Sequence, residues 1–366
     1  MEKIYQVEKK IMKHLKIFTK EDILNITHIR RFETKLGEKI HVTEAAEDVE
    51  KRIQNSNALF VIVGVPEDIG IKGNLGIGGA DTAWQPFLHS FLNIQSNDFL
   101  HGDEILLLGQ FDFSGIKELI EKNSANYEEK IKAYRQATAM IDEEVEQLVS
   151  IISRNNKIPI IVGGGHNNAY GCIKGAAKGL YHAGHLPIAE INAINLDAHA
   201  DYRPLEGRHS GNSFRYAEED GYLEKYCIIG LHENYLTQNM WLDIANNPFL
   251  DFISFEDIFI HEKRTFRQAL AHACSFTETS FCGIELDLDS IENVLSSAFT
   301  PVGISAIHAR QYVQYAAQNC MVAYLHICEG ATQLADNRRS PSTGKLIAYL
   351  VSDFIKAIVE KSSMKK

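Results

Sequence analysis

Apolar residues gather into short continuous runs that recur along most of the chain. Runs of this kind are typical of strands buried on both faces of a parallel sheet. They predict strands at residues 58–65, 104–109, 158–162, 191–196, 226–231, 252–255, 280–288 and 322–328. The segments between them space their apolar residues helically and predict helices at residues 81–92, 127–155, 169–180, 235–245, 263–273, 307–318 and 345–360. The alternation of strands and helices predicts an α/β fold with three layers, α/β/α, and a central, mainly parallel sheet.

The chain shows no Pro- or Ser-rich linker, no internal repeat and no low-complexity segment. We therefore expect residues 1–366 to form a single domain. Residues 1–55 mix charged and apolar positions at helical spacing, so we expect them to be a helical segment packed on the outside of that domain.

Composition narrows the class of protein. A hydrophobic content of 45% over 366 residues is enough for a large core, while a net charge of -11 leaves no basic stripe that could neutralise the phosphates of a nucleic acid. No apolar run approaches the roughly 20 residues needed to cross a bilayer, and the first residues are charged. We expect a cytoplasmic protein without nucleic-acid or membrane partners. Its six scattered cysteines fit buried thiols in a reducing compartment better than a zinc site or a disulfide framework.

Acidic and histidine side chains follow one of the predicted strands. The strand at 191–196 runs into Asp197, His199 and Asp201, and residues two apart on an extended chain point to the same side. Carboxylate oxygens suit Mn²⁺ or Mg²⁺, and imidazole nitrogen is tolerated by Mn²⁺ and Zn²⁺. This segment predicts half of a metal site.

Two further strand ends carry the same kinds of side chain. His166 follows the strand at 158–162, and the strand at 280–288 carries Glu285 and Asp287, with Asp289 just beyond. Carboxylates inside an apolar strand need a compensating cation or access to water, because unpaired buried charges are costly. His166, Asp197, His199, Asp201, Asp287 and Asp289 together supply about what two divalent ions with shared carboxylates require.

These segments resemble the ureohydrolase (arginase-like) family, whose signatures are Gly-Gly-x-His, Asp-Ala-His-x-Asp and Asp-x-Asp after successive parallel strands. The chain has all three in that order, at residues 163–166, 197–201 and 287–289, and the resemblance covers about residues 58 to 354. It implies two Mn²⁺ ions per chain. One ion would be held by His166, Asp197, Asp201 and Asp287, and the other by Asp197, His199, Asp287 and Asp289, so that Asp197 and Asp287 bridge them.

The resemblance also implies a reaction, the hydrolysis of a carbon–nitrogen bond in a linear amidine or guanidine. Two cations that share a water lower its pKa and supply hydroxide near neutral pH. Asp201 would accept the remaining proton and return it to the leaving nitrogen. Glu329, after the strand at 322–328, matches the family carboxylate that pairs with the cationic head of the substrate.

The segment after Asp201 is the guide to the substrate. Ser210 and Asn212 match the family's Ser-Gly-Asn/Thr motif, which contacts the amino-acid end of the substrate. Arg203 stands where arginases have Asn, and Phe214 stands where they have a proton-shuttling His, which resembles the formimidoylglutamase branch. An Arg near the mouth favours a substrate carboxylate. We therefore expect N-formimidoyl-L-glutamate to be hydrolysed to L-glutamate and formamide, a step of histidine breakdown.

Several points stay open at this stage. Another ureohydrolase activity that releases urea (arginase, agmatinase or guanidino-acid hydrolase) and a non-catalytic regulatory protein of the same fold are the alternatives. The expected partner is a small amidino or guanidino acid, and a homo-oligomer is possible. Further candidate ligand residues are Arg208 and His209 for a second carboxylate, and Glu67, Asp68 and Asn74 in the glycine-rich segment 66–80. The chain departs from the family at Ile77, at Asn167 and at residues 290–293, but no metal ligand is lost.

Overall fold

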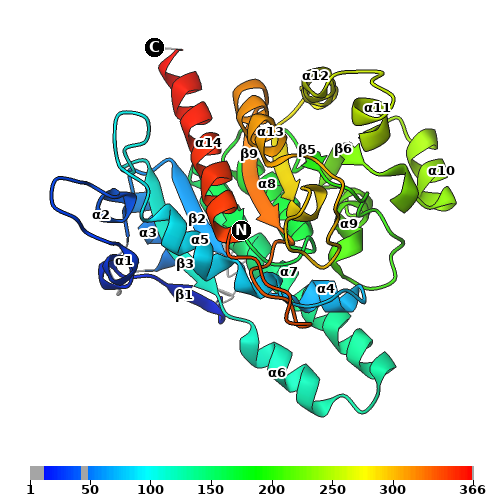
Figure 1. The fold of residues 1–366 in the computed structure, drawn as a ribbon, viewed down its shortest axis with the longest axis horizontal. Helices are drawn as coiled ribbons and strands as arrows, with labels where there is room; N and C mark the ends of the chain where they lie inside the picture. The colour runs from blue at the N-terminus through cyan, green and yellow to red at the C-terminus, as the bar shows by residue number, and fades with distance from the viewer. Residues whose placement is uncertain (1–11, 43–47, 365–366) are drawn as a thin grey trace, which may run out of the picture.

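The computed structural model describes residues 12–42 and 48–364 and shows one nine-stranded sheet (Figure 1). The order of strands is β1-β3-β2-β4-β9-β8-β5-β6-β7. β1 is antiparallel to β3, and every other neighbouring pair is parallel. The strands are β1 (Leu15–Ile17), β2 (Phe60–Gly64), β3 (Ile105–Phe111), β4 (Ile158–Val162), β5 (Ile191–Leu196), β6 (Leu223–Leu231), β7 (Leu250–Ser254), β8 (Cys282–Asp287) and β9 (Val322–Cys328).

The predicted α/β class with a mainly parallel central sheet is confirmed. Each strand predicted from an apolar run is present, with ends that differ by a few residues. In β2, Phe60 and Ile62 join the core on one face of the sheet, whereas Val61 and Val63 join the core on the other. A strand that buries side chains on both faces is apolar at successive positions. For this reason these strands could be predicted from the sequence.

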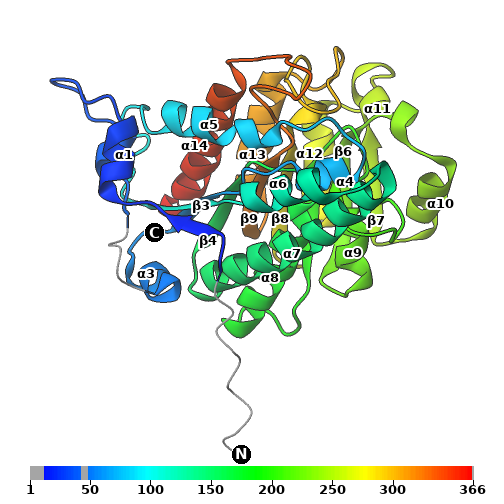
Figure 2. The ribbon, with the colours of Figure 1, turned by 90° about the horizontal axis from the view of Figure 1, so that it is seen from below.

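Helices cover both faces of the sheet. Figure 2 shows α7 and α8 on one side of the strands and α5, α13 and α14 on the other. The first core contains residues of α1 (Lys20–Ile26), α2 (Leu36–Lys39), α5 (Trp84–Phe91), α11 (Phe255–Phe259), α12 (Phe266–Phe276), α13 (Ala306–Asn319) and α14 (Thr343–Ser363). The second core contains residues of α3 (Val49–Asn55), α4 (Ile69–Gly73), α6 (Ser114–Asn123), α7 (Tyr127–Arg154), α8 (Asn168–His182), α9 (Ser213–Glu219) and α10 (Gln238–Asn246).

The N-terminal segment corrects one prediction. Residues 1–11 and 43–47 of the expected helical segment lie outside the described residues. Within the rest of it, α1, α2 and α3 are short helices, but Leu15–Ile17 is the edge strand β1, in register with Phe111 to Gly109 of β3. A segment this short has no clear period in the sequence, so pairing with β3 decides its conformation.

No helix among residues 12–42 and 48–364 combines the length and the apolar character that a membrane span requires.

The strand order in the middle of the sheet, β4-β9-β8-β5, is the part of the fold that matters for function. These strands are adjacent and parallel, so the segments that follow their carboxyl ends emerge at one edge of the sheet. Open α/β sheets bind ligands at this edge.

Candidate metal centre

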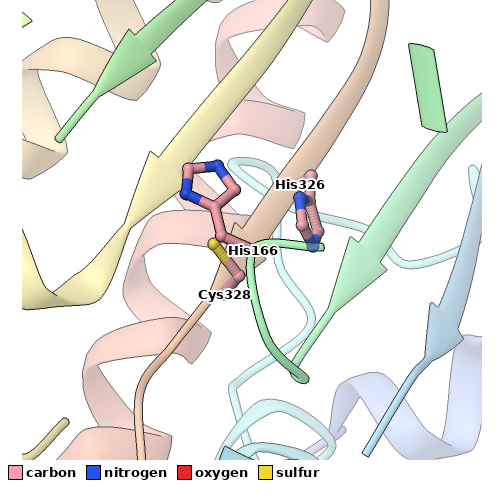
Figure 3. Close-up of side chains that lie close together, drawn as sticks. All are labelled: His166, His326 and Cys328. Atoms are coloured by element: carbon pink, nitrogen blue, oxygen red, sulfur yellow. The ribbon is translucent and has the colours of Figure 1, made fainter. Parts of the chain in front are cut away.

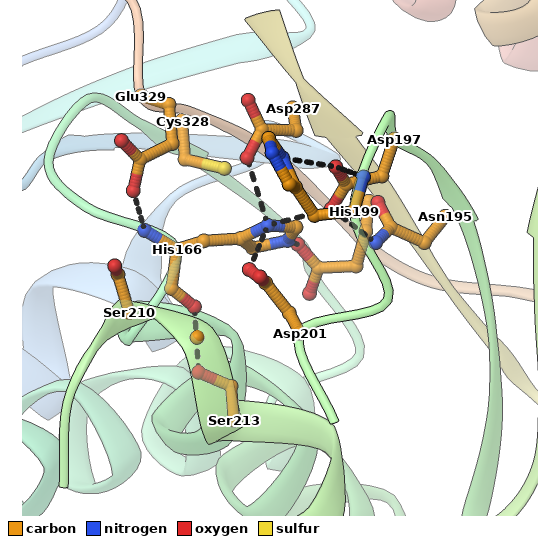
Figure 4. Close-up of polar contacts among 12 residues, drawn as sticks. His166, Asn195, Asp197, His199, Asp201, Ser210, Ser213, Asp287, Cys328 and Glu329 are labelled. Carbon is orange, nitrogen blue, oxygen red and sulfur yellow. Dashed lines mark hydrogen bonds and ion pairs between the residues drawn. The ribbon is translucent and has the colours of Figure 1, made fainter. Parts of the chain in front are cut away.

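Histidine and acidic side chains from these four strand ends converge at the carboxyl edge of the sheet (Figure 4). The first and the last of them in the sequence, His166 and Glu329, are 163 residues apart, and the strand order brings them together. The residues are His166 after β4, Asp197, His199 and Asp201 after β5, Asp287 and Asp289 at the end of β8, and Glu329 after β9.

A first group of ligand atoms surrounds the imidazole of His166. Its Nδ1 atom lies 2.9 Å from Asp201 Oδ2 and 3.0 Å from Asp287 Oδ2. Asp197 Oδ2 is 3.2 Å from the same nitrogen. Neighbouring ligands of an octahedral ion with bonds of about 2.1 Å lie about 3 Å apart. These four atoms therefore have the spacing of ligands around one divalent cation.

A second group consists of Asp197, His199 and Asp289. His199 Nδ1 lies 3.3 Å from Asp289 Oδ2 and 3.6 Å from Asp197 Oδ1. Asp197 thus belongs to both groups, with one oxygen directed to each. Asp287 falls in the first group only, and its assignment as a second bridging residue stays a prediction.

Tight turns hold the two carboxylates at the strand ends. Asp197 Oδ1 accepts a hydrogen bond from the backbone N–H of His199 at 2.7 Å, and Asp287 Oδ1 accepts one from the N–H of Asp289 at 2.8 Å. An aspartate that caps the backbone two residues later fixes its own rotamer and the start of the turn. The Asp289 side chain is therefore placed by the 3₁₀ turn at Leu288–Ser290, directly after β8.

The centre has the properties of a cation site. Both ring nitrogens of His166 and the Oδ1 atom of Asp289 are buried without a hydrogen-bond partner. Burial opposes a charge on His166, yet Cys328 and the neighbouring aspartates raise its pKa well above the ordinary range. The direction of this shift reflects the negative charge around the imidazole, which a divalent cation would balance in place of the proton. The donor set of carboxylate oxygens and imidazole nitrogens suits Mn²⁺.

Asp201 and Glu329 have backbone φ angles of 45° and 63°, in the left-handed region. Such strain in non-glycine residues is concentrated at functional sites. Glu329 Oε1 accepts a hydrogen bond from the His166 N–H at 2.9 Å. Burial, with the charge of Asp289, raises the pKa of Glu329 to about 8, and burial beside Asp197 raises the pKa of Asp201 to about 6. A cation bound near these carboxylates would relieve the repulsion between them.

A buried polar layer lies behind His166, on β8 and β9. Glu285 Oε2 is 3.4 Å from His166 Nε2 and 2.6 Å from His326 Nδ1, and Glu285 Oε1 accepts a hydrogen bond from Tyr324 Oη at 2.6 Å. Figure 3 shows His326 beside His166, with Cys328 close to the same ring. Glu285 was recognisable as part of a carboxylate ladder, but its partners are cross-strand neighbours that the sequence places far away.

A cavity of about 270 Å³ opens onto the acidic cluster. Asp201, Glu329, Arg203 and Ser210 line it, as does Asn74, whose Nδ2 lies 3.4 Å from Ser210 Oγ. Arg203 donates through Nη2 to Glu206 Oε1 at 3.0 Å and is 47% exposed. The predicted substrate-binding pair Arg203 and Ser210 is therefore at the cavity, with Arg203 towards solvent.

Asn212 is a correction to the predicted substrate contacts. Its side chain is fully buried and does not line the cavity. Instead its Oδ1 accepts a hydrogen bond from the His209 N–H at 3.1 Å, and its Nδ2 donates to Gly207 O at 2.8 Å. Asn212 thus closes the loop that presents Ser210. The same loop holds the buried Arg208, which donates through Nε to Asp142 Oδ2 of α7 at 2.8 Å and is not available for a substrate carboxylate.

Glu67 is also used inside the protein and not as a ligand. Its Oε1 accepts hydrogen bonds from the Gly165 N–H at 3.0 Å and from the side chains of Asn167 and Asn168 at 3.1 and 2.9 Å. Glu67 Oε2 accepts one from the Ile69 N–H at 2.7 Å. Glu67 therefore ties the loop of His166 to the segment after β2. Asn167, one of the positions at which the chain departs from the family, thus has a structural role in this contact.

Known proteins match the chain over most of its length. The family model described as the arginase family matches residues 58–355. A formimidoylglutamase from Staphylococcus aureus (strain JH9) is 28% identical over 234 residues, which cover 61% of this chain and 70% of that protein.

Solved structures share the fold. Formimidoylglutamase from Bacillus subtilis subsp. subtilis str. 168 has a TM-score of 0.69 at 17% identity, covering 91% of this chain and 94% of that chain. Formiminoglutamase from Trypanosoma cruzi with Mn2+2 has a TM-score of 0.66 at 20% identity, covering 89% of this chain and 98% of that chain. At these identities the structural likeness establishes the fold. The family match across residues 58–355 shows that the chain belongs to the arginase family of hydrolases.

Proposed function

We propose that this protein hydrolyses N-formimidoyl-L-glutamate to L-glutamate and formamide, with two Mn²⁺ ions bound by the two ligand groups at the sheet edge. The observation that carries the proposal is the polarity of the 270 Å³ cavity, whose lining includes both the buried acidic cluster and the half-exposed Arg203. A substrate with a cationic head and a carboxylate at the other end matches that arrangement.

The proposed ligands are His166, Asp197, Asp201 and Asp287 for one ion, and Asp197, His199, Asp287 and Asp289 for the other. Bound there, divalent cations acidify a water molecule and supply hydroxide at neutral pH. The Mn2+2 of the Trypanosoma cruzi formiminoglutamase supports the choice of metal. The closely spaced carboxylate oxygens and the unpartnered His166 Nδ1 support the presence of at least one cation.

The side chains around the cavity have distinct proposed roles. Glu329 pairs with the amidinium and holds its carbon over the centre, because Glu329 lines the cavity next to Asp289. Asp201 accepts a proton on its carboxylate and returns it to the nitrogen that leaves. Arg203 pairs with a carboxylate of the substrate, and Ser210 donates a hydrogen bond to the same end.

Phe214 supports the choice of an amidino acid over arginine. Its ring is fully buried, edge-on to His166 at a centroid distance of 5.3 Å and stacked on Tyr226 at 4.0 Å. The phenyl ring has no titratable proton, so it cannot act as a proton shuttle, and it fills space next to the centre. The relatives named formimidoylglutamase support the same substrate. With this substrate, the proposal includes a role in histidine breakdown and a cytoplasmic location.

Product analysis tests the proposal. The protein loaded with Mn²⁺ would be incubated with N-formimidoyl-L-glutamate, arginine, agmatine and guanidinobutyrate in parallel. We expect formamide and glutamate from the first substrate and no urea from the others. Glu329→Gln, which keeps the shape of the side chain and removes its charge, should lose turnover while still binding metal.

The other outcomes are equally informative. Urea from arginine, agmatine or guanidinobutyrate would show that this compound is the substrate in place of N-formimidoyl-L-glutamate. Hydrolysis at this centre would still hold. Metal binding without any product would support a regulatory protein of the same fold and overturn the proposal.

A further inference from the structure

A cluster of buried thiols lies at the opposite edge of the sheet from the metal centre. Cys274 is near the end of α12, Cys320 directly follows α13, and Cys282 begins β8. The Sγ atoms of Cys274 and Cys320 are 3.4 Å apart, and Cys282 Sγ lies 3.7 Å from Thr277 Oγ1 in the same group. None of the six cysteines is in a disulfide in the structure.

The thiols lie close to solvent although they are buried. Cys274 is 8% exposed and Cys320 is 4% exposed. A cavity of about 480 Å³ runs between α12 and α13 and is lined by Leu270, one turn before Cys274, and by Asn319, directly before Cys320. The cavity therefore opens one helical turn from Cys274 and at the residue directly before Cys320.

The surroundings of Cys320 make its thiol more acidic than that of Cys274. Lys361 of α14 donates through Nζ to Cys320 O at 2.7 Å and to Ala317 O at 3.2 Å, which puts a positive charge at the end of α13. Hydrogen bonding with the side chains of Cys274 and Cys282, together with this charge, lowers the pKa of Cys320 to about 4. A thiolate is the reactive form of cysteine, so we expect Cys320 to be the first sulfur to be oxidised.

We propose that Cys274 and Cys320 are a redox modification site, at which hydrogen peroxide forms a reversible disulfide between the ends of α12 and α13. The site is separate from the metal centre. Cys282 and Asp287 are the first and last residues of β8, and five steps of about 3.3 Å along a strand separate them by about 17 Å. The proposal does not depend on which substrate the enzyme hydrolyses.

The reaction balances with one peroxide for two thiols. The Cys320 thiolate attacks one oxygen of hydrogen peroxide, the O–O bond breaks, and hydroxide leaves and takes up a proton to become water. The sulfenic acid on Cys320 is then attacked by the sulfur of Cys274, which loses its proton as the S–S bond forms and the second water leaves. Two sulfurs lose one electron each, and the peroxide gains both.

The disulfide would close a loop between residues 46 apart in sequence. Such a link restricts the unfolded chain, so the oxidised protein should be more resistant to heat than the reduced protein. The bond joins helices on one face of the sheet, whereas the His166 loop lies at the other edge.

The test uses the full-length protein. After mild treatment with hydrogen peroxide, the intact mass should fall by about 2 Da and return on addition of dithiothreitol, since a disulfide has two fewer hydrogens than two thiols. Proteolysis without reductant should give a linked pair of peptides that contain Cys274 and Cys320. The thermal midpoint of the oxidised protein should rise by a few degrees.

Variants give matched controls. Cys274→Ala and Cys320→Ala should each abolish the mass loss, whereas Cys172→Ala, which removes a fully buried thiol of α8, should keep it. A link that involves another cysteine, or no mass loss where the unfolded protein is oxidised by the same treatment, would overturn the assignment. An oxidised protein with an unchanged or lower thermal midpoint would overturn the proposed stabilisation.

Discussion

His166 Nε2 lies 3.4 Å from Glu285 Oε2, so a buried carboxylate faces the edge of the imidazole that is turned away from the acidic cluster. A histidine that binds metal through one nitrogen usually donates the proton on the other nitrogen to such a group, which fixes its tautomer and its orientation. Glu285 is therefore expected to direct the lone pair of His166 Nδ1 towards a cation.

Removing the charge of Glu285 should weaken metal binding. Glu285→Gln keeps the size of the side chain, yet it leaves the His326 imidazole and the Tyr324 hydroxyl beside an amide in place of a carboxylate. We expect Mn²⁺ affinity to fall about 10- to 100-fold, which is the usual effect of losing such an outer partner. Titration against a chelating dye measures it.

Tyr324→Phe is the control for that experiment. It removes one hydrogen bond to Glu285 and leaves the contact with His166 in place. Its loss of affinity should be smaller than that of Glu285→Gln. Equal affinities for the wild type and Glu285→Gln would show that His166 is oriented without the carboxylate.

The number of bound ions distinguishes the roles of Asp197 and Asp289. Asp197 belongs to both ligand groups, whereas Asp289 belongs to one. Asp197→Ala should therefore lose both Mn²⁺ ions, while Asp289→Ala should keep one. Elemental analysis after gel filtration gives the Mn²⁺ content per chain. One ion retained by Asp197→Ala would contradict its proposed bridging position.

Arg203→Ala should act on substrate binding and not on the chemical step. Arg203 lines the cavity at its exposed end, so losing its pairing with a substrate carboxylate should raise KM about tenfold and leave kcat nearly unchanged. Steady-state kinetics with N-formimidoyl-L-glutamate measures both constants.

Arg310→Ala is a matched control for Arg203→Ala. Arg310 is 46% exposed and paired with Asp353 at 2.5 Å, and it lies on α13 away from the cavity. Its kinetic constants should equal those of the wild type. An unchanged KM in Arg203→Ala would remove this residue from the substrate site.

The buried pair of Asp142 and Arg208 should matter for stability. Asp142→Ala leaves the Arg208 guanidinium buried without its carboxylate partner, and losses of this kind cost about 3–5 kcal/mol in the free energy of unfolding. Because Arg208 also donates to Asn167 O at 2.9 Å, the loops of His166 and Ser210 should loosen together. Urea denaturation measures the change.

A surface pair gives the comparison. Asp243 is 42% exposed and binds Arg215 Nη1 at 2.6 Å, so Asp243→Ala should cost less than about 1 kcal/mol. If both variants lost the same small amount, the buried pair would not hold the loops.

Much of the fold and of the candidate site could be predicted from the sequence, for a local reason. A strand buried on both faces is apolar at successive positions, as in Ile191–Leu196, and candidate ligands such as Asp197 and His199 follow such a strand. Neither feature depends on which segments are neighbours in space. The chain alone therefore determined the α/β class and the segments that hold the acidic and histidine side chains.

The tertiary structure decided the contacts between segments that are distant in sequence. The order β4-β9-β8-β5 brings Glu329 to the backbone of His166, and the register of β8 with β9 sets Glu285 opposite His326. Packing also turned Asn212 inwards, although its motif predicted a substrate contact. Local periodicity reports which face of an element is buried, but strand order, register and loop packing depend on the free energy of the whole fold, which no single segment encodes.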